Sequence, residues 1–134
     1  MGRRLIFVTL PGETLHLGER ADMRQLSMPL LEKLLRINDA YDKKYDDVDP
    51  FRITTRLAEE CGELAAQVNH FEGSGSKRQK LGEPSKQALA AEVIDVMRCA
   101  LHLATYYEVM PEMETVAVSV LTQLEEEGWL SEKR

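Results

Sequence analysis

Apolar residues recur at helical spacing over most of the chain after residue 27. In the first such stretch, apolar side chains return every three or four positions, at Leu30, Leu34, Ile37 and Tyr41. This period places them on one face of an amphipathic helix. Ser27, just before the stretch, has a side chain suited to cap the helix N-terminus.

A second helix is predicted between two strong boundary signals. Asp49 is suited to the N-cap and Pro50 to the first helical position, where its missing N–H costs no hydrogen bond. Gly73 marks the end of the helix. Between these boundaries the apolar stripe consists of Ile53, Leu57, Cys61, Leu64, Val68 and Phe71.

Two more helices are predicted in the second half of the chain. Ser85 caps the third, over residues 86–109, and Pro111 opens the fourth, over residues 111–127. Glycines, serines and basic residues fill positions 73–85, and this composition predicts a loop between the second and third helices.

The pattern is different near the start of the chain. Residues 4–10 are rich in apolar and β-branched side chains and run into the turn signal Pro11-Gly12, which indicates a short β-hairpin or an extended arm. We therefore expect an arm or hairpin over residues 1–20 and one helical domain over residues 21–134. The fold class is all-α, a four-helix bundle.

Length and composition narrow the possible functions. The chain has 134 residues, which suits a single domain. With 17 basic and 23 acidic side chains its formal net charge is -6, which argues against nonspecific nucleic-acid binding. The negative net charge does not exclude a small phosphorylated ligand, because a bound metal ion can supply positive charge. No apolar stretch approaches the roughly 20 residues that span a bilayer, so we expect no membrane association.

The two cysteines do not make a disulfide framework. Cys61 and Cys99 both lie in apolar helical patterns, so we expect buried free thiols. Free thiols are typical of the reducing cytoplasm, which is the expected location.

The third predicted helix carries an unusual pair of acids. It is apolar almost all round, with only a narrow strip near Arg98 and Thr105 left for water. A helix of this kind is buried, yet Glu92 and Asp95 lie on its flank, one turn apart. An ionised carboxylate in such surroundings is costly unless it is paired or bound to a metal.

The second predicted helix carries a matching set. Glu59, Glu60 and Glu63 form an EExxE motif beside the apolar stripe. If the two helices pack antiparallel, their four flanking carboxylates meet and repel one another, and a divalent ion removes that repulsion. Oxygen ligands of this kind suit Mg²⁺ or Mn²⁺ rather than zinc. The alternative is that the glutamates form a solvated face or pair with Lys and Arg.

These two motifs resemble a known family. EExxE at residues 59–63 is followed, after 28 intervening residues, by ExxD at residues 92–95. This combination is similar to the signature of the MazG-like, all-α nucleoside triphosphate pyrophosphohydrolases, and the resemblance covers residues 28–127. It implies cleavage of a (d)NTP between the α and β phosphates, giving a nucleoside monophosphate and pyrophosphate, and a role in clearing unwanted nucleotides.

The resemblance also implies roles for individual acids. By motif position, the Mg²⁺ (or Mn²⁺) ligands are Glu60, Glu63, Glu92 and Asp95. Glu59 is an additional ligand or a base that orients water, so the catalytic set is Glu59, Glu60 and Glu63.

One substrate contact follows from the same resemblance, and the others follow from positive charge near the acids. His70 is expected on the base, with a polar helix end as its alternative reading. Lys77, Arg78 and Lys80 are expected to hold phosphate, with a solvated loop as the alternative. Arg98 is expected to reach phosphate or to pair with the acids.

Three neighbouring side chains are open to two readings. His102 is expected to make a structural hydrogen bond rather than a phosphate contact. Tyr41 and Tyr45 are expected either to line a base pocket or to be core and rim residues.

The resemblance further implies an assembly. Members form dimers or dimers of dimers, so we expect a homodimer or homotetramer in contact through the first and fourth helices.

The segment 124–127 is acidic where many members carry substrate-holding residues. Two rival functions therefore stay open: a phosphoribosyl-ATP pyrophosphohydrolase-like enzyme, and a non-catalytic helical module that binds metal or nucleotide.

Overall fold

The computed structural model describes residues 7–10, 13–16, 29–46, 48–73 and 76–130. The side chains of residues 7–10, 13–16 and 77–78 lie outside this description, as does the predicted cap Ser27. The chain divides into two compact units, residues 1–33 and 34–134.

The first unit contains a small antiparallel sheet. Strand β1 (Phe7–Leu10) pairs with β2 (Glu13–His16), with Phe7 opposite His16 and Leu10 opposite Glu13. Of the two forms left open by the sequence, the structure therefore has the hairpin.

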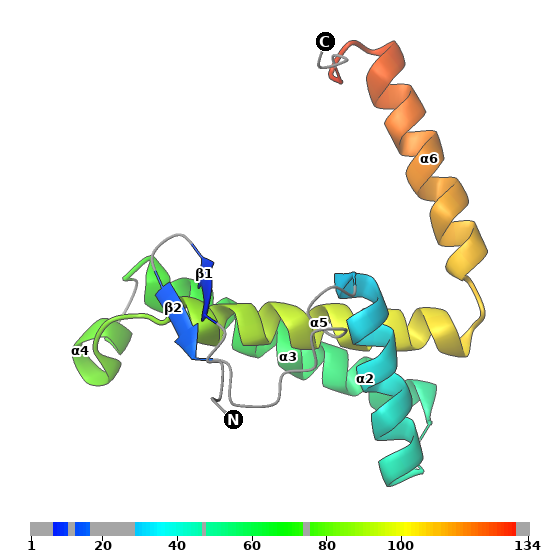
Figure 1. Cartoon of the computed structure of the whole chain (residues 1–134). Helices are drawn as coiled ribbons and strands as arrows, with labels where there is room; N and C mark the ends of the chain where they lie inside the picture. Colours follow the sequence, from blue (N-terminus) through cyan, green and yellow to red (C-terminus); the bar gives the residue numbers. More distant parts are fainter. Residues whose placement is uncertain (1–6, 11–12, 17–28, 47, 74–75, 131–134) are drawn as a thin grey trace, which may run out of the picture. The chain divides into compact units, whose positions relative to one another are not determined.

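Four long helices lie close to where the hydrophobic pattern puts them. They are α2 (Leu30–Tyr45), α3 (Pro50–Phe71), α5 (Lys86–Tyr106) and α6 (Met110–Glu126) (Figure 1). Apart from the hairpin, the described part of the chain is all-helical, as expected. The predicted N-caps of α3 and α5 are confirmed: the Asp49 carboxylate accepts from the Phe51 N–H at 3.0 Å, and the Ser85 hydroxyl from the Ala88 N–H at 3.3 Å.

Two predicted boundaries are wrong. The segment 73–85 is not a continuous loop, because it contains the short helix α4 (Lys77–Leu81). Helix α5 ends at Tyr106 rather than at residue 109, since Glu108 adopts the left-handed conformation, with φ 56°. That conformation cannot continue a right-handed helix.

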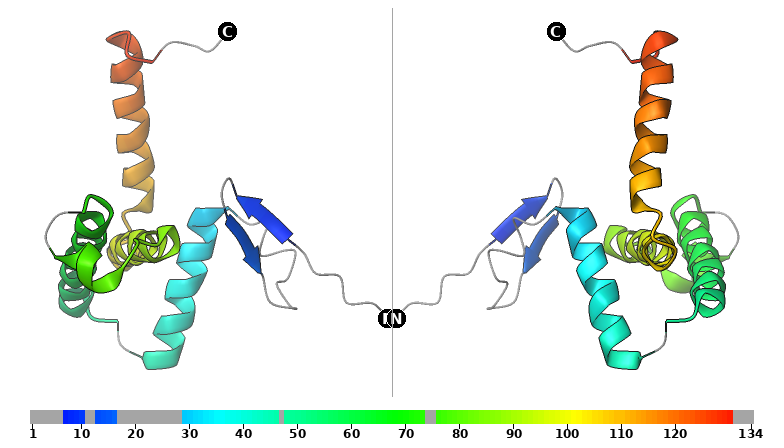
Figure 2. Two further views of the ribbon diagram at one scale, coloured as in Figure 1. Left: turned by 90° about the vertical axis from the view of Figure 1, so that its left-hand side faces the viewer. Right: turned by 90° about the vertical axis from the view of Figure 1, so that its right-hand side faces the viewer.

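Helices α3 and α5 lie side by side (Figures 1 and 2). They run antiparallel, because Glu60 near the middle of α3 interacts with Asp95, and Glu63 one turn later interacts with the earlier Glu92. Helix α2 is joined to α5 by two polar contacts, from Asn38 to Arg98 and from Asp42 to His102.

The buried core is small. Its apolar members in the described part are Leu34, Ile53, Cys99, Leu101 and Ala104. Cys99 is buried, as expected, but Cys61 is exposed, so the sequence interpretation of that thiol is wrong.

The orientation of α5 also differs from the prediction. Arg98, expected in the strip that faces water, is buried, whereas Val93 and Met97 of the predicted apolar face are about 40% exposed. The flank that carries the acids faces α3 instead. This arrangement is possible because the Arg98 guanidinium finds polar partners inside the protein.

Helix α6 has no buried residue. Its apolar side chains Met113, Val116, Val120 and Leu121 are all exposed. None of the described helices is long and apolar enough to cross a membrane.

The N-cap of α3 is a testable element of this fold. Replacing Asp49→Ala removes the acceptor for the Phe51 N–H, and we expect a loss of about 1 kcal/mol in the free energy of unfolding, measured by urea denaturation. The control Asp39→Ala removes an exposed ion pair with Lys43 and should cost less than about 0.5 kcal/mol. Equal losses of unfolding free energy in the two variants would show that the N-cap hydrogen bond does not stabilise α3 more than an exposed ion pair does.

Candidate metal centre

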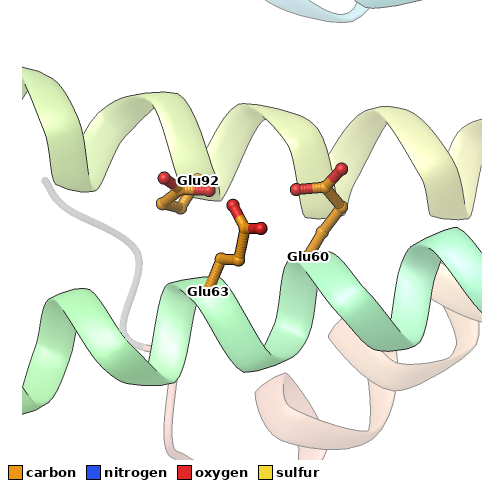
Figure 3. Close-up of side chains that lie close together, drawn as sticks. All are labelled: Glu60, Glu63 and Glu92. Carbon is orange, nitrogen blue, oxygen red and sulfur yellow. The ribbon is translucent and has the colours of Figure 1, made fainter.

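Three glutamates from two helices converge at the centre of the α3–α5 pair. Glu60 and Glu63 lie one turn apart on α3, and Glu92 projects from α5 between the two helices (Figure 3). One carboxylate oxygen from each residue lies within 4.8 Å of the other two. We call these residues the glutamate cluster. Sequence analysis named all three among the four metal ligands.

The electrostatics of the cluster are unfavourable without a cation. Partial burial raises the pKa of Glu60, and the negative charges of Asp95, Glu63 and Glu92 raise it further, while Arg98 lowers it. The pKa of Glu92 is raised as well, first by loss of solvent, then by the charges of Glu63 and Asp95 and by a hydrogen bond with Glu63. Like charges held at this range disfavour ionisation.

The donor set fits a hard divalent ion. Carboxylate oxygens are the ligands that Mg²⁺ and Mn²⁺ prefer, and an ion of charge +2 would cancel the repulsion that raises both pKa values. The neighbouring sulfur atom of Cys99 is buried, and desolvation raises the pKa of its thiol, so it stays protonated rather than serving as a soft ligand. The residues are therefore suited to Mg²⁺ or Mn²⁺.

The fourth predicted ligand, Asp95, lies beside the cluster. It is close enough to raise the pKa of Glu60, but its Oδ1 accepts hydrogen bonds from Arg98 Nε at 3.3 Å and Nη2 at 3.2 Å. Glu59 is exposed and lies outside the group of three.

His70 has a structural partner. Its side chain is buried, and Nε2 lies 2.8 Å from the carbonyl oxygen of Gly82. Gly82 has φ 78°, a left-handed conformation that favours glycine. His70 thus ties the end of α3 to the segment after α4, which favours the second of its two readings over a contact with a base.

The structure describes only some of the predicted phosphate contacts. Lys80 is exposed on α4, and the side chains of Lys77 and Arg78 lie outside the described residues. Arg98 is buried and bonded to Asp95, which matches its expected pairing with the acids rather than a reach toward phosphate.

A pocket of about 280 Å³ is lined in part by Arg98, the residue that bonds Asp95. It is bounded by side chains from α2, α3 and α5, namely Tyr41, Asp42, Tyr45, Arg52, Ile53, Arg56, Arg98 and His102. The tyrosines are exposed there (41% and 61%), so they belong to the pocket rather than to the core. Each ring lies near a cation: Arg98 Cζ is 4.9 Å from the Tyr41 centroid, and Lys44 Nζ is 4.9 Å from that of Tyr45.

His102 makes the structural hydrogen bond that the sequence analysis expected. Its Nε2 lies 2.9 Å from Asp42 Oδ1. The same contact holds Asp42 half-buried against α5.

Sequence analysis missed three residues of this region. Arg52 and Arg56 precede Glu60 by two turns and one turn of α3, and this spacing of four was a usable signal. Asn38 interrupts the apolar stripe of α2 next to Ile37, and a polar residue at such a position indicates a buried polar contact.

No protein-family model, no curated protein and no solved structure matches this chain. Its interpretation therefore depends on the residues themselves and their geometry.

The raised pKa values predict an unusual pH dependence of stability. Because Glu60 and Glu92 bind protons more readily in the folded than in the unfolded state, they stabilise the metal-free protein as the pH falls from neutral toward the ordinary glutamate pKa of 4.5. Bound Mn²⁺ needs ionised carboxylates, so the increase in Tm that it causes should shrink over the same range.

Thermal unfolding of the wild type and of Glu60→Gln, with and without Mn²⁺, tests this prediction. The Gln variant removes one of the repelling charges and should raise the metal-free Tm at neutral pH while reducing the effect of Mn²⁺. A metal-free Tm at neutral pH that falls in the Gln variant would show that the Glu60 carboxylate is stabilising, contrary to the prediction.

Proposed function

We propose that this protein is a Mg²⁺- or Mn²⁺-dependent pyrophosphohydrolase that cleaves nucleoside triphosphates between the α and β phosphates. The observation that carries the proposal is the glutamate cluster, in which three carboxylate oxygens from two helices lie within 4.8 Å of one another. The resemblance of the EExxE and ExxD motifs to the MazG-like family supplies the reaction class. A nucleotide-clearing role follows from that resemblance.

The acidic residues have two proposed roles, to hold the ion and to orient water. Glu60, Glu63 and Glu92, with Asp95 beside them, hold the ion. When bound, that ion polarises the phosphate oxygens and lowers the pKa of an attacking water. Glu59, one residue before Glu60 and exposed to solvent, is proposed to orient that water. Phosphoryl transfer asks little more of a protein than positioning and charge.

The pocket lined in part by Arg98 is proposed to receive the nucleoside. Tyr41 and Tyr45 offer aromatic surface, and every nucleobase has a face that can stack on it. Arg56 lines the same pocket one turn before Glu60, and it makes no hydrogen bond or ion pair with any described residue. Arg56 is therefore available to a ligand that extends from the cluster.

A second copy of the chain is proposed to complete the active form. The exposed apolar side chains of α6, together with Val93 and Met97 of α5, are an unusual amount of apolar surface for a monomer. A homodimer or homotetramer would cover them.

Pyrophosphate release tests the reaction. Wild-type protein with Mg²⁺ or Mn²⁺ and a broad panel of nucleotides, phosphoribosyl-ATP included, should release pyrophosphate from at least one of them. The substitution Glu63→Gln removes a ligand charge and should reduce the release to background while the helical circular dichroism is unchanged. The control Glu72→Gln removes an exposed acid at the end of α3 and should retain activity. Metal binding with no release from any nucleotide would instead favour the non-catalytic module.

The nucleoside pocket has its own test. Loss of one stacking side chain is worth about 1–3 kcal/mol, so Tyr45→Ala should raise KM roughly tenfold with a smaller effect on kcat. Tyr107→Ala is a matched control, because Tyr107 is 61% exposed, as Tyr45 is, but lies outside the pocket. Equal KM values in the two variants would show that the nucleobase does not stack on Tyr45, contrary to the proposal.

A further inference from the structure

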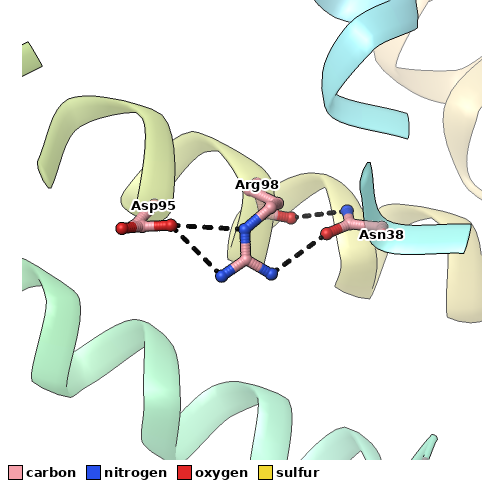
Figure 4. A network of polar contacts seen from close by, with 3 residues as sticks. All are labelled: Asn38, Asp95 and Arg98. Carbon is pink, nitrogen blue, oxygen red and sulfur yellow. Dashed lines mark hydrogen bonds and ion pairs between the residues drawn. The ribbon is translucent and has the colours of Figure 1, made fainter. Parts of the chain in front are cut away.

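Arg98 is the most constrained charged side chain in the described part of the second unit. It is 7% exposed, and it exchanges two hydrogen bonds with Asn38, which is 4% exposed. Asn38 Nδ2 donates to the Arg98 carbonyl oxygen at 2.8 Å, and Arg98 Nη1 donates to Asn38 Oδ1 at 3.3 Å (Figure 4). The amide and carbonyl ends of Asn38 are both in use, so α2 fixes the guanidinium from one side.

The ring of Tyr41 restrains the same guanidinium. Arg98 Cζ lies 4.9 Å from the ring centroid, within the range of a cation–π contact. Arg98 is thus held in one position by α2 before any ligand arrives.

Two further N–H groups of Arg98 donate to a single atom of Asp95. Nε and Nη2 both donate to Oδ1 of Asp95, at 3.3 and 3.2 Å, whereas Oδ2 of the same carboxylate points away from Arg98 (Figure 4). Oδ2 has no hydrogen-bond partner among the described residues. The Asp95 carboxylate therefore has one oxygen fixed and one oxygen open, beside the glutamate cluster whose Glu60 it influences.

We propose that Arg98 is a positioning residue for the metal centre: with Asn38 behind it, it fixes Asp95 by Oδ1 so that Oδ2 serves the divalent ion. The inference rests on the proposed metal site, and it adds that α2 sets the metal affinity through two residues that never touch the ion. Removing a residue that holds a metal ligand by a hydrogen bond, without touching the ion, typically weakens metal affinity about 10–100-fold.

A competing physical effect makes the inference testable. The positive charge of Arg98 repels a metal cation, and an Arg98–Asp95 pair that must break before metal binds would weaken affinity. If Arg98 were only such a competitor, weakening its hold on Asp95 would tighten metal binding. If it positions Asp95, weakening its hold must loosen metal binding.

Two variants separate these effects because both keep the charge. Arg98→Lys retains a cation but loses the planar fork that reaches Asp95 and Asn38 together. Asn38→Ala leaves Arg98 intact and removes only the support behind it. The control Arg36→Lys makes the same chemical change at an exposed position of α2.

The measurement is the Kd of Mn²⁺ alone, by calorimetry near neutral pH, with circular dichroism to verify each fold. We expect Arg98→Lys to weaken Mn²⁺ binding about tenfold and Asn38→Ala to weaken it in the same direction, with Arg36→Lys unchanged. Unchanged or tighter binding in either folded test variant would overturn the inference, and so would a wild type that binds no Mn²⁺. Because no nucleotide is used, the expected pattern supports the inference even if pyrophosphate release is never detected.

Discussion

Repulsion among carboxylates held between α3 and α5 is the constraint on which the rest of this structure depends. Packing two antiparallel helices brings Glu60, Glu63 and Glu92 within reach of one ion, and it raises the pKa of two of them. A protein that needed only a stable helix pair would not gather like charges at these partly exposed positions, because their mutual repulsion costs free energy. The repulsion lowers the stability of the helix pair, and its relief by a cation is the basis of the proposed metal site.

The surroundings of the cluster reduce that cost without cancelling it. Arg98 faces Asp95, and its charge opposes the rise in the pKa of Glu60. One turn further along α5, His102 contacts Asp42, so both basic residues of this face of α5 are bonded to acids. The His102–Asp42 contact joins α5 to α2, and the Arg98–Asp95 pair lies within α5 beside the contact of Arg98 with Asn38 of α2. The same polar residues therefore hold α2 in place and shape the charge around the candidate metal centre.

Features set by local chemistry were predictable from the sequence, and features set by packing were not. Asp49 and Ser85 cap their helices as expected, since a cap bonds to N–H groups two or three residues away. The glutamate pairs were found because a spacing of three fixes a shared helix face. The burial of Arg98 was missed because it depends on Asn38, 60 residues away in sequence. The bond of His70 to Gly82 likewise requires the path of the segment that contains α4, which composition had assigned to a loop.

The error about α5 bears on assembly. Its sequence shows one broad apolar face, yet within the chain the flank with Glu92, Asp95 and Arg98 turns inward, while Val93 and Met97 are left about 40% exposed. A helix that is apolar on nearly all sides removes its apolar side chains from water only if other protein surface packs against each side. Among the described residues of α5, Leu101 and Ala104 are buried together with Arg98 and Cys99, so part of its apolar surface is covered within the chain and part is not. The exposed side chains Val93 and Met97 thus have the composition of an interior without the burial of one, and this exposed apolar surface is the physical basis for proposing a second copy.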